Sequence, residues 1–277
     1  LKFLNRHSKY SNKLLLDSGL FVLKENILKE KFYDRIMFPI RSKRGKVVGF
    51  TGRIMPGNDW GPKYMNSPET PIFHKKDNLF GQYESRQEIR KKDIAIICEG
   101  STDVISSHQH GIKNIIAPLG TSLTTEQLQN IKALTNNVLF FFDSDTAGKA
   151  ALVRAFKLAS ELKMNPYAAN ASPYKDIDEM LQKEPNTFAK LTEERMEAFS
   201  FILKDFLFDK DLNRLNNIEE IREIADSLLE SVEDPITKNH YIDKLFTITK
   251  IRYDKGRTYS RPVTKKGDRP KAFPVKG

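Results

Sequence analysis

The stretch "NNVLFFFDSDTAGKAA" at residues 136–151 combines a buried strand with a charged end. Residues 138–142 form a continuous apolar run, which is typical of a strand covered on both faces in a parallel sheet. Asp143 and Asp145 follow at once, so an extended backbone holds two like charges roughly 6–7 Å apart. Such a pair is unfavourable unless the acids cap a helix, pair with bases or bind a cation, and the residues alone leave these alternatives open.

Strand and helix patterns alternate along residues 93–164. We expect strands at 93–100, 114–122 and 137–145, and helices at 101–111, 124–135 and 146–164, with Thr124 or Thr125 as the N-cap of the second helix. This order predicts a parallel sheet with right-handed crossovers. Ligands of such sheets bind outside the carboxyl ends of the strands, where Glu99, Asp143 and Asp145 lie. We therefore expect these three acids to converge on one crevice.

The flanking segments have different patterns. Residues 11–18 and 24–31 predict short amphipathic helices, and residues 36–41 and 47–54 predict a hairpin that turns at Gly45. The chain after residue 180 is predicted to be helical to about residue 254, and residues 256–277 to be a disordered basic tail or linker. We expect an N-terminal basic α+β subdomain at 1–90, which the start at Leu1 suggests is truncated, a parallel-sheet α/β domain at 91–180, a helical subdomain at 181–255 and the tail.

Bulk composition restricts the class of protein. The 277 residues carry a net charge of +10 and one cysteine, Cys98, which excludes an internal disulfide and a multi-cysteine zinc ribbon and fits a reducing cytoplasm. No apolar stretch approaches the length of a membrane span, so we expect a cytoplasmic protein without a membrane partner. Residues 41–92 contain 12 Lys/Arg against 5 acids, which suits a polyanion bound beside an acidic site. A solvated basic face is the alternative.

A cluster of Glu and Asp oxygens is the ligand set of a hard cation, and Mg²⁺ is the usual ion beside phosphates. Asp176 and Asp178 repeat the i, i+2 spacing and offer a second metal or a water-mediated shell. The structural alternatives are that Asp145, Asp176 and Asp178 cap helices and that Asp103 is a first-turn helix charge. His108 and His110 face different sides of a helix, and Cys98 lies inside a strand, so neither suggests a zinc site.

Several motifs resemble known families. "EGSTDV" at 99–104 and "DSDTAG" at 143–148 resemble the two signatures of the TOPRIM domain, which DnaG-type primases share with type IA and II topoisomerases and some nucleases. "DRIMFPIRSKRGKVVGFTGR" at 34–53 and "PKYMNSPETPIFHKKDNLFGQYESR" at 62–86 are similar to bacterial DnaG-type primases in particular. "APLGTSLT" at 117–124 and "KDID" at 175–178 extend the resemblance over nearly all of residues 30–180.

The resemblance implies a mixed α/β fold, in which a TOPRIM parallel-sheet domain is flanked by an N-terminal α+β and a C-terminal helical subdomain. It implies metal-dependent synthesis of short RNA primers from nucleoside triphosphates on single-stranded DNA during DNA replication. Glu99, Asp143 and Asp145 match the metal site, and Asp103, Asp176 and Asp178 match supporting catalytic acids. The implied contacts to template, primer or nucleotide are Arg53, Lys63, Asn66 and Lys75, each of which is otherwise a solvated surface residue.

The resemblance also implies cofactors and partners. Mg²⁺ is expected, with Mn²⁺ as an alternative, and zinc only in a domain that is absent from this chain. The expected partners are the template, the RNA primer, nucleoside triphosphates and, through a further absent domain, the replicative helicase, with the chain itself a monomer. Two other functions stay open: another TOPRIM enzyme, such as a nuclease or a topoisomerase-like protein, and a non-catalytic remnant that binds single-stranded DNA.

Overall fold

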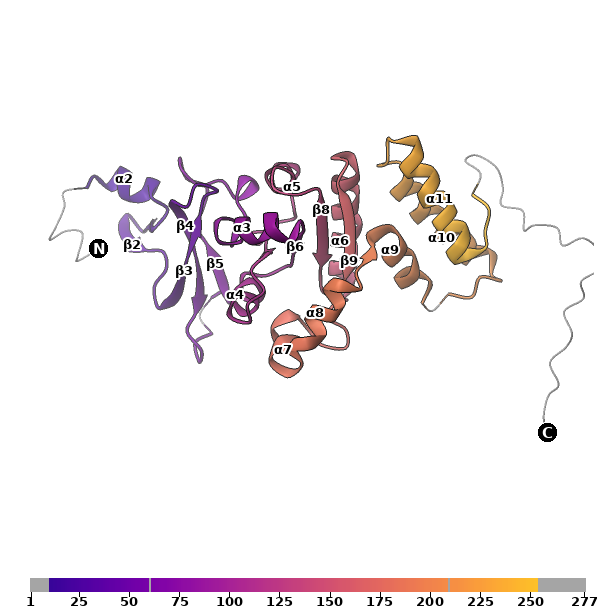
Figure 1. Cartoon of the computed structure of the whole chain (residues 1–277). Coiled ribbons are helices and arrows are strands. Elements are labelled where there is room, and N and C mark those ends of the chain that lie inside the picture. The colour runs from indigo at the N-terminus through magenta and orange to yellow at the C-terminus, as the bar shows by residue number, and fades with distance from the viewer. Residues whose placement is uncertain (1–9, 60, 209, 254–277) are drawn as a thin grey trace, which may run out of the picture. The chain divides into compact units, whose positions relative to one another are not determined.

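The computed structural model describes residues 10–59, 61–208 and 210–253 (Figure 1). Its chain divides into two compact units, Leu1–Ile202 and Leu203–Gly277. The first unit contains a five-stranded sheet, a three-stranded sheet and a two-stranded hairpin. The described part of the second unit is helical. The domain boundaries expected at residues 90, 180 and 255 stay predictions, and the predicted disordered tail lies outside the described residues.

The five-stranded sheet confirms the predicted parallel α/β fold. Its strands are β6 (Ala95–Ile97), β7 (Ile115–Ile116), β8 (Asn137–Phe141), β9 (Asn165–Ala169) and β10 (Met196–Glu197). They lie in the order β10-β9-β8-β6-β7, and all neighbours are parallel except β10, which pairs antiparallel with β9. The sequence predicted β6, β7 and β8 but neither β9 nor β10.

The helices α4 (Ser101–Gln109), α5 (Thr125–Lys132) and α6 (Thr146–Glu161) connect these strands as predicted. The α5 helix begins with a capping box, in which the Thr124 hydroxyl accepts from the Gln127 N–H and the Gln127 side chain accepts from the Thr124 N–H. Thr124 is therefore the N-cap. Two further helices, α7 (Ile177–Lys183) and α8 (Pro185–Glu193), precede β10.

The strand order creates a switch point between β6 and β8. From β6 the chain passes through α4 to β7 on one side, and from β8 it passes through α6 to β9 on the other. Right-handed crossovers in opposite directions place α4 and α6 on opposite faces of the sheet. The carboxyl ends of β6 and β8 are consequently left uncovered between the two connections, which is where ligands of open α/β sheets bind.

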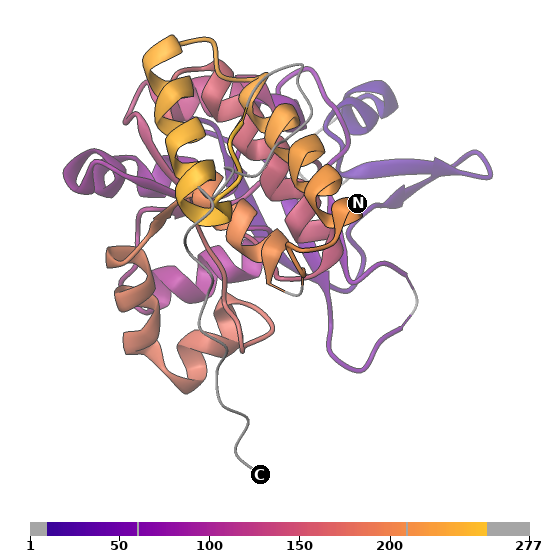
Figure 2. The ribbon, with the colours of Figure 1, turned by 90° about the vertical axis from the view of Figure 1, so that its right-hand side faces the viewer.

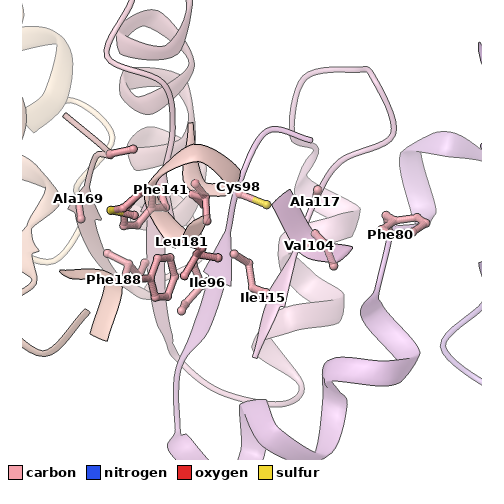
Figure 3. Close-up of a cluster of buried hydrophobic side chains, with 14 of the residues drawn as sticks. Phe80, Ile96, Cys98, Val104, Ile115, Ala117, Phe141, Ala169, Leu181 and Phe188 are labelled. Atoms are coloured by element: carbon pink, nitrogen blue, oxygen red, sulfur yellow. The ribbon is translucent and has the colours of Figure 1, made fainter. Parts of the chain in front are cut away.

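One face of the sheet packs into a hydrophobic cluster with α4, α7 and α8 (Figure 3). Ile96 and Leu139 are register partners on β6 and β8 and point into this cluster. The ring of Phe141 stacks on that of Phe188 from α8, with centroids 5.2 Å apart. Alternation along the strands turns Ile97 to the opposite face, where it is also fully buried. The strands are therefore covered on both faces, as the apolar run in β8 predicted.

The three-stranded sheet confirms the predicted hairpin and extends it. β3 (Arg35–Arg41) and β4 (Val47–Ile54) pair antiparallel, and β5 (Tyr64–Asn66) adds a third strand that the sequence did not predict. Gly45 has a φ of +85°, which the turn between β3 and β4 requires. The short helix α2 (Asn12–Asp17) matches the first predicted helix. A 3₁₀ turn η1 (Lys75–Asp77) and helix α3 (Gln82–Lys92) lead to β6.

The helix predicted at residues 24–31 is wrong. This segment belongs to a hairpin of β1 (Phe21–Lys24) and β2 (Ile27–Glu30). Glu25 and Asn26 both adopt positive φ, at 51° and 59°, which gives the two-residue connection whose twist suits a hairpin. Phe21 is buried at the start of β1, and this tertiary contact favours the strand over the weak helical periodicity.

In the second unit, α10 (Leu215–Leu229) and α11 (Pro235–Thr249) lie side by side (Figure 2). The division between the units falls within α9 (Ala198–Leu207). Leu228, Leu229 and Leu245 are buried, and the Tyr253 hydroxyl bonds to the Asp226 carboxylate. These elements confirm the predicted helical region. Within the described ranges, no helix is both long and apolar enough to cross a membrane.

Candidate active site

Two of the predicted metal ligands meet at the carboxyl ends of neighbouring strands. Glu99 follows β6, and Asp143 follows β8. The backbone N–H of Asp143 donates a hydrogen bond to Oε1 of Glu99 across 3.0 Å. Glu99 is exposed and Asp143 is half-buried, so both carboxylates are accessible from the switch point. The sheet topology therefore brings these acids together from positions 44 residues apart.

Asp145 lies beside them but is used as a helix cap. Its Oδ1 accepts a hydrogen bond of 2.8 Å from the N–H of Gly148 at the start of α6. Gly148 has no room for a side chain, because a Cβ there would lie 2.1 Å from the Asp143 carbonyl oxygen and 2.9 Å from Oε1 of Glu99. The glycine of the "DSDTAG" motif thus allows the helix start to approach the acidic strand end.

Of the predicted supporting acids, Asp103 and Asp176 act on this edge through their charges, whereas the Asp178 carboxylate accepts a hydrogen bond from Gln182 Nε2 at 3.1 Å. Asp103 on α4 is 9% exposed, and burial together with the charges of Asp176 and Asp143 raises its pKa to about 7. Backbone N–H groups of Asp178 and Gly100 act in the opposite direction. Asp176 caps α7 by accepting from the Glu179 N–H at 2.9 Å. The cap that the sequence offered as an alternative role for Asp176 is therefore present.

The charges of several carboxylates act on Asp143 at this edge. Burial and the charges of Glu99, Asp145 and Asp176 raise the pKa of Asp143 to about 6, whereas Lys175 lowers it. The sequence had not singled out Lys175, although it stands in the "KDID" motif. A group of carboxylates at an accessible strand edge suits a divalent cation, which would neutralise part of their charge.

The side chains are not arranged as a ready-made metal site. Among the residues that the structure describes, no group of three or more His, Cys, Asp or Glu side chains could hold a metal ion as placed. Glu99 and Asp145 each use one carboxylate oxygen for a backbone hydrogen bond. The donor chemistry fits a hard cation, and Glu99, Asp143 and Asp145 would hold it after their side chains turn. Their assignment as ligands stays a prediction.

A pocket of about 340 Å³ lies beside Glu99. Residues of the loop after β7 and Phe142 also line it. Arg154 of α6 also lines it and adds a cation near the acidic edge, which the sequence did not single out because Arg154 stands within an ordinary amphipathic helix pattern. The other lining residues are Pro118, Gly120, Thr121, Ser122, Leu123, Ala147, Ala151 and Ala155.

Two of the predicted nucleic-acid-binding residues, Arg53 and Asn66, lie on one face of the three-stranded sheet. Arg53 is the register partner of Tyr64, and Thr51 that of Asn66, so these side chains share a face. The Arg53 guanidinium and the Lys63 ammonium each lie 5.9 Å from the centre of the Tyr64 ring. Tyr64 is a further candidate that was not predicted from the sequence, although an aromatic residue among basic ones is a signal for nucleic-acid binding.

This basic face is attached to the parallel sheet. Asn66 Nδ2 donates to the Leu119 carbonyl at 2.8 Å, which joins β5 to the loop that lines the pocket. Lys75 lies in η1, and its backbone N–H donates to Oε1 of Glu69 at 3.0 Å. Asn66 thus has a structural role in addition to its predicted contact with nucleic acid or nucleotide. The basic and acidic residues belong to one compact unit.

His108, His110 and Cys98, which the sequence did not favour as zinc ligands, lie in separate structural environments. His108 Nε2 lies 3.3 Å from both the Ser85 hydroxyl and the Ile115 carbonyl, and burial lowers its pKa. His110 Nδ1 lies 2.9 Å from the Ser106 carbonyl. Cys98 is 1% exposed inside the hydrophobic cluster, and burial raises the pKa of its thiol well above the usual value. Cys98 is a core thiol, as predicted.

Two family models match the chain. The model of the DNA primase catalytic core, N-terminal domain, matches residues 1–86, and a Toprim-like model matches residues 96–181. The chain is also similar to a solved DNA primase domain from Pseudomonas aeruginosa, with 32% identity and a TM-score of 0.77 over 89% of this chain and 79% of that one. The chain belongs to the bacterial DnaG-type primase family. It corresponds to the catalytic core of these primases, and family membership implies the use of a divalent metal.

Two further comparisons place this primase core among its relatives. It is 35% identical over 249 residues to the DNA primase of Clostridium acetobutylicum, which covers 88% of this chain and 40% of that protein. The chain therefore spans about two fifths of the length of the curated relatives that it matches. It is 31% identical, with a TM-score of 0.77, to a DnaG primase catalytic domain whose structure is bound to single-stranded DNA, over 89% of this chain and 79% of that one.

Proposed function

We propose that this primase core joins ribonucleoside triphosphates into short RNA primers on a single-stranded DNA template during DNA replication. The observation that carries the proposal is the pairing of Glu99 and Asp143 at the switch point, beside a basic face that Asn66 ties to the same site. Carboxylates and phosphates of nucleic acid repel each other unless cations intervene. An acidic edge with flanking basic residues suits phosphoryl transfer, in which metal ions act on the reacting oxygens.

Glu99, Asp143 and Asp145 are proposed to hold the divalent cation, which we expect to be Mg²⁺ with Mn²⁺ as a substitute. When bound, the metal neutralises charge on the attacking and leaving oxygens. Asp103, Asp176 and Asp178 add negative potential behind the edge and so favour the cation. Lys175, which lowers the pKa of Asp143, helps to keep that carboxyl ionised as a ligand at neutral pH.

The basic residues are proposed to bind the nucleic acid and the nucleotide. Arg53, Lys63 and Lys75 contact phosphates of the template, primer or incoming triphosphate, and the Tyr64 ring stacks on a base. The pocket beside Glu99, which Arg154 and residues 118 and 120–123 help to line, is proposed to bind the incoming nucleotide. The pocket volume of about 340 Å³ lies in the range of small-molecule sites. The relative bound to single-stranded DNA supports the proposed template.

The wider context is also a proposal. We expect the chain to act as a monomer in the cytoplasm, and the replicative helicase to be a partner of the whole protein. Among the residues that the structure describes, no observation favours a topoisomerase, which needs a tyrosine nucleophile that attacks DNA. A nuclease shares the acidic edge, so the assay must separate the two reactions.

The test is RNA synthesis on an unstructured single-stranded DNA with labelled ribonucleotides and Mg²⁺ or Mn²⁺, both with and without a pre-annealed RNA primer. The proposal predicts short RNAs that depend on the template and disappear in Asp143→Asn. Asp17→Asn, which removes an exposed acid from α2, is the matched control and should leave synthesis unchanged. Cleavage of the template without synthesis would instead indicate a nuclease, and salt-sensitive binding without either reaction would indicate a binding remnant.

A further inference from the structure

One segment, residues 119–130, contacts both the acidic edge and the basic residues. Its beginning accepts the Asn66 hydrogen bond at Leu119 and lines the pocket that contains Glu99. Its end is the first two turns of α5, which lies against η1. The η1 turn carries Lys75, a residue of the proposed basic site. The segment is therefore a continuous link between the two halves of the site.

Gln127 is the central residue of this link. Its side chain is fully buried, with 0% exposure. Its amide Nε2 donates to the Lys75 carbonyl at 2.9 Å and to the Asn78 carbonyl at 2.8 Å. Its Oε1 accepts from the Thr124 N–H at 3.1 Å. Both amide hydrogens are thus used on the η1 turn, and the oxygen holds the amide in orientation through the helix cap.

Neighbouring residues complete the same contact. The Thr124 hydroxyl donates to the Lys76 carbonyl at 2.7 Å, and Asn130 Nδ2 donates to the Asp77 carbonyl at 3.1 Å. The four successive carbonyls of residues 75–78 therefore all accept hydrogen bonds from side chains at the start of α5. A three-residue 3₁₀ turn has poor internal hydrogen bonds, so these external donors largely determine where the turn lies.

We propose that Gln127 is a positioning residue that fixes Lys75 relative to the acidic edge. The inference rests on the proposed function, in which Lys75 contacts a phosphate. A contact of this kind depends on placement, because a shift of about 1 Å in a positioning group is enough to weaken catalysis markedly. Gln127 touches neither nucleic acid nor metal in this account, and it acts through the backbone of η1.

The first test is amide hydrogen exchange in the free protein. Gln127→Met removes both donors at similar volume, and Gln129→Met changes an exposed glutamine of the same helix as the matched control. We expect faster exchange in Gln127→Met at the Asp77 and Asn78 amides, which bond to the His74 and Lys75 carbonyls, and unchanged exchange in α6 and in the control. Asn130→Ala removes one of the four bonds and should show a smaller effect if Gln127→Met does not fold.

The second test is a double-mutant cycle with Lys75→Gln, read as affinity for a single-stranded DNA oligonucleotide. We expect each single variant to weaken binding by about three- to fivefold and the double variant to be no weaker than Lys75→Gln, because Gln127 acts through Lys75. The inference would be overturned if the losses of affinity in the two single variants were additive in the double variant, or if Lys75→Gln bound DNA as well as the parent. It would also be overturned if amide exchange at residues 77–78 were unchanged in both Gln127→Met and Asn130→Ala. Absence of RNA synthesis from every variant would refute the proposed function alone, since neither test requires chemistry.

Discussion

The Asp143 N–H and the Glu99 carboxylate are hydrogen-bonded across 3.0 Å, which joins the ends of β8 and β6. These strands are parallel neighbours whose onward connections run in opposite directions. The contact therefore marks the switch point of the sheet, and it lets the backbone of one acidic residue partly compensate the charge of the other. The acidic edge follows from topology as much as from the motifs themselves.

Gly148→Ala is expected to disrupt this edge. The added Cβ would stand 2.1 Å from the Asp143 carbonyl oxygen, which belongs to the backbone and cannot turn away. We expect a loss of about 1–3 kcal/mol in the free energy of unfolding, measured by urea denaturation, together with loss of primer synthesis. Ala150→Ser, at an exposed position of the same helix, is the control and should stay near the parent. A Gly148→Ala protein as stable and active as the parent would show that the helix start does not need this close approach.

In the metal-free protein, the contribution of Asp103 and Asp143 to stability is expected to fall as pH rises from about 4 to about 7, whereas His108, whose pKa burial lowers, acts in the opposite direction. The folded-state pKa values of Asp103 and Asp143 are raised to about 7 and about 6, so the folded protein holds these protons more tightly than the unfolded chain. Between the unfolded and the folded pKa the folded state binds more protons, and deprotonation therefore lowers the free energy of unfolding. Asp103→Asn should reduce this dependence and raise stability at pH 8 by roughly 1–4 kcal/mol.

The measurement is urea denaturation in EDTA at several pH values between 4 and 8. Asp17→Asn removes an exposed carboxylate and should follow the parent curve. If Asp103→Asn were destabilised equally at pH 5 and pH 8, the Asp103 carboxyl would have a hydrogen-bonding role that outweighs its charge.

The Cys98 thiol is expected to be inert in the native protein. It is 1% exposed, and burial raises its pKa, so neither access nor ionisation favours attack. A thiol reagent such as DTNB should label it only after unfolding, and the labelling rate in dilute denaturant should follow global opening of the parallel sheet. Rapid labelling of the native protein would indicate that the cluster around β6 opens locally.

Tyr64 is expected to contribute to binding of single-stranded DNA through its ring. Tyr64→Ala should weaken affinity by about 1–3 kcal/mol, as is usual for loss of a stacked base, whereas Tyr64→Phe should bind like the parent. Lys63→Gln should instead reduce the salt dependence of binding, because it removes a cation that displaces counterions. Fluorescence anisotropy at several salt concentrations separates these effects. Equal losses for Tyr64→Phe and Tyr64→Ala would assign the contribution to the hydroxyl.

Local patterns in the sequence predicted the central elements. The apolar run of β8, the Thr124 cap of α5 and the hairpin turn at Gly45 each have a signal within a few residues. Strands that depend on distant partners could not be found in this way. β5 is three residues long and is defined by its pairing with β4, and β9 begins with Asn165 and Pro166, which are unfavourable in strands.

The candidate site likewise combines features that local sequence signals predict with features that depend on residues far apart in the sequence. The motifs located Glu99, Asp143 and Asp145, and strand order explains why two of these acids meet. The pKa of Asp103 depends on Asp176, which is far away in sequence, and the contact of Gln127 with Lys75 spans 52 residues. Such relationships arise only from the packing of separate elements. Individual residues in an amphipathic helix, such as Arg154, carry no local signal that they line a pocket.

The most direct test of the account is Mn²⁺ binding followed by electron paramagnetic resonance, in the parent, in Asp143→Asn and in the control Asp17→Asn. We predict saturable binding by the parent and by Asp17→Asn, and at least about tenfold weaker binding by Asp143→Asn, since removal of one charged ligand from a hard-cation site costs more than an exposed ion pair. Thermal stability of metal-free Asp143→Asn should equal or exceed that of the parent, because a repelled charge is removed. Undiminished Mn²⁺ affinity in a folded Asp143→Asn protein would contradict the claim that this edge holds the metal.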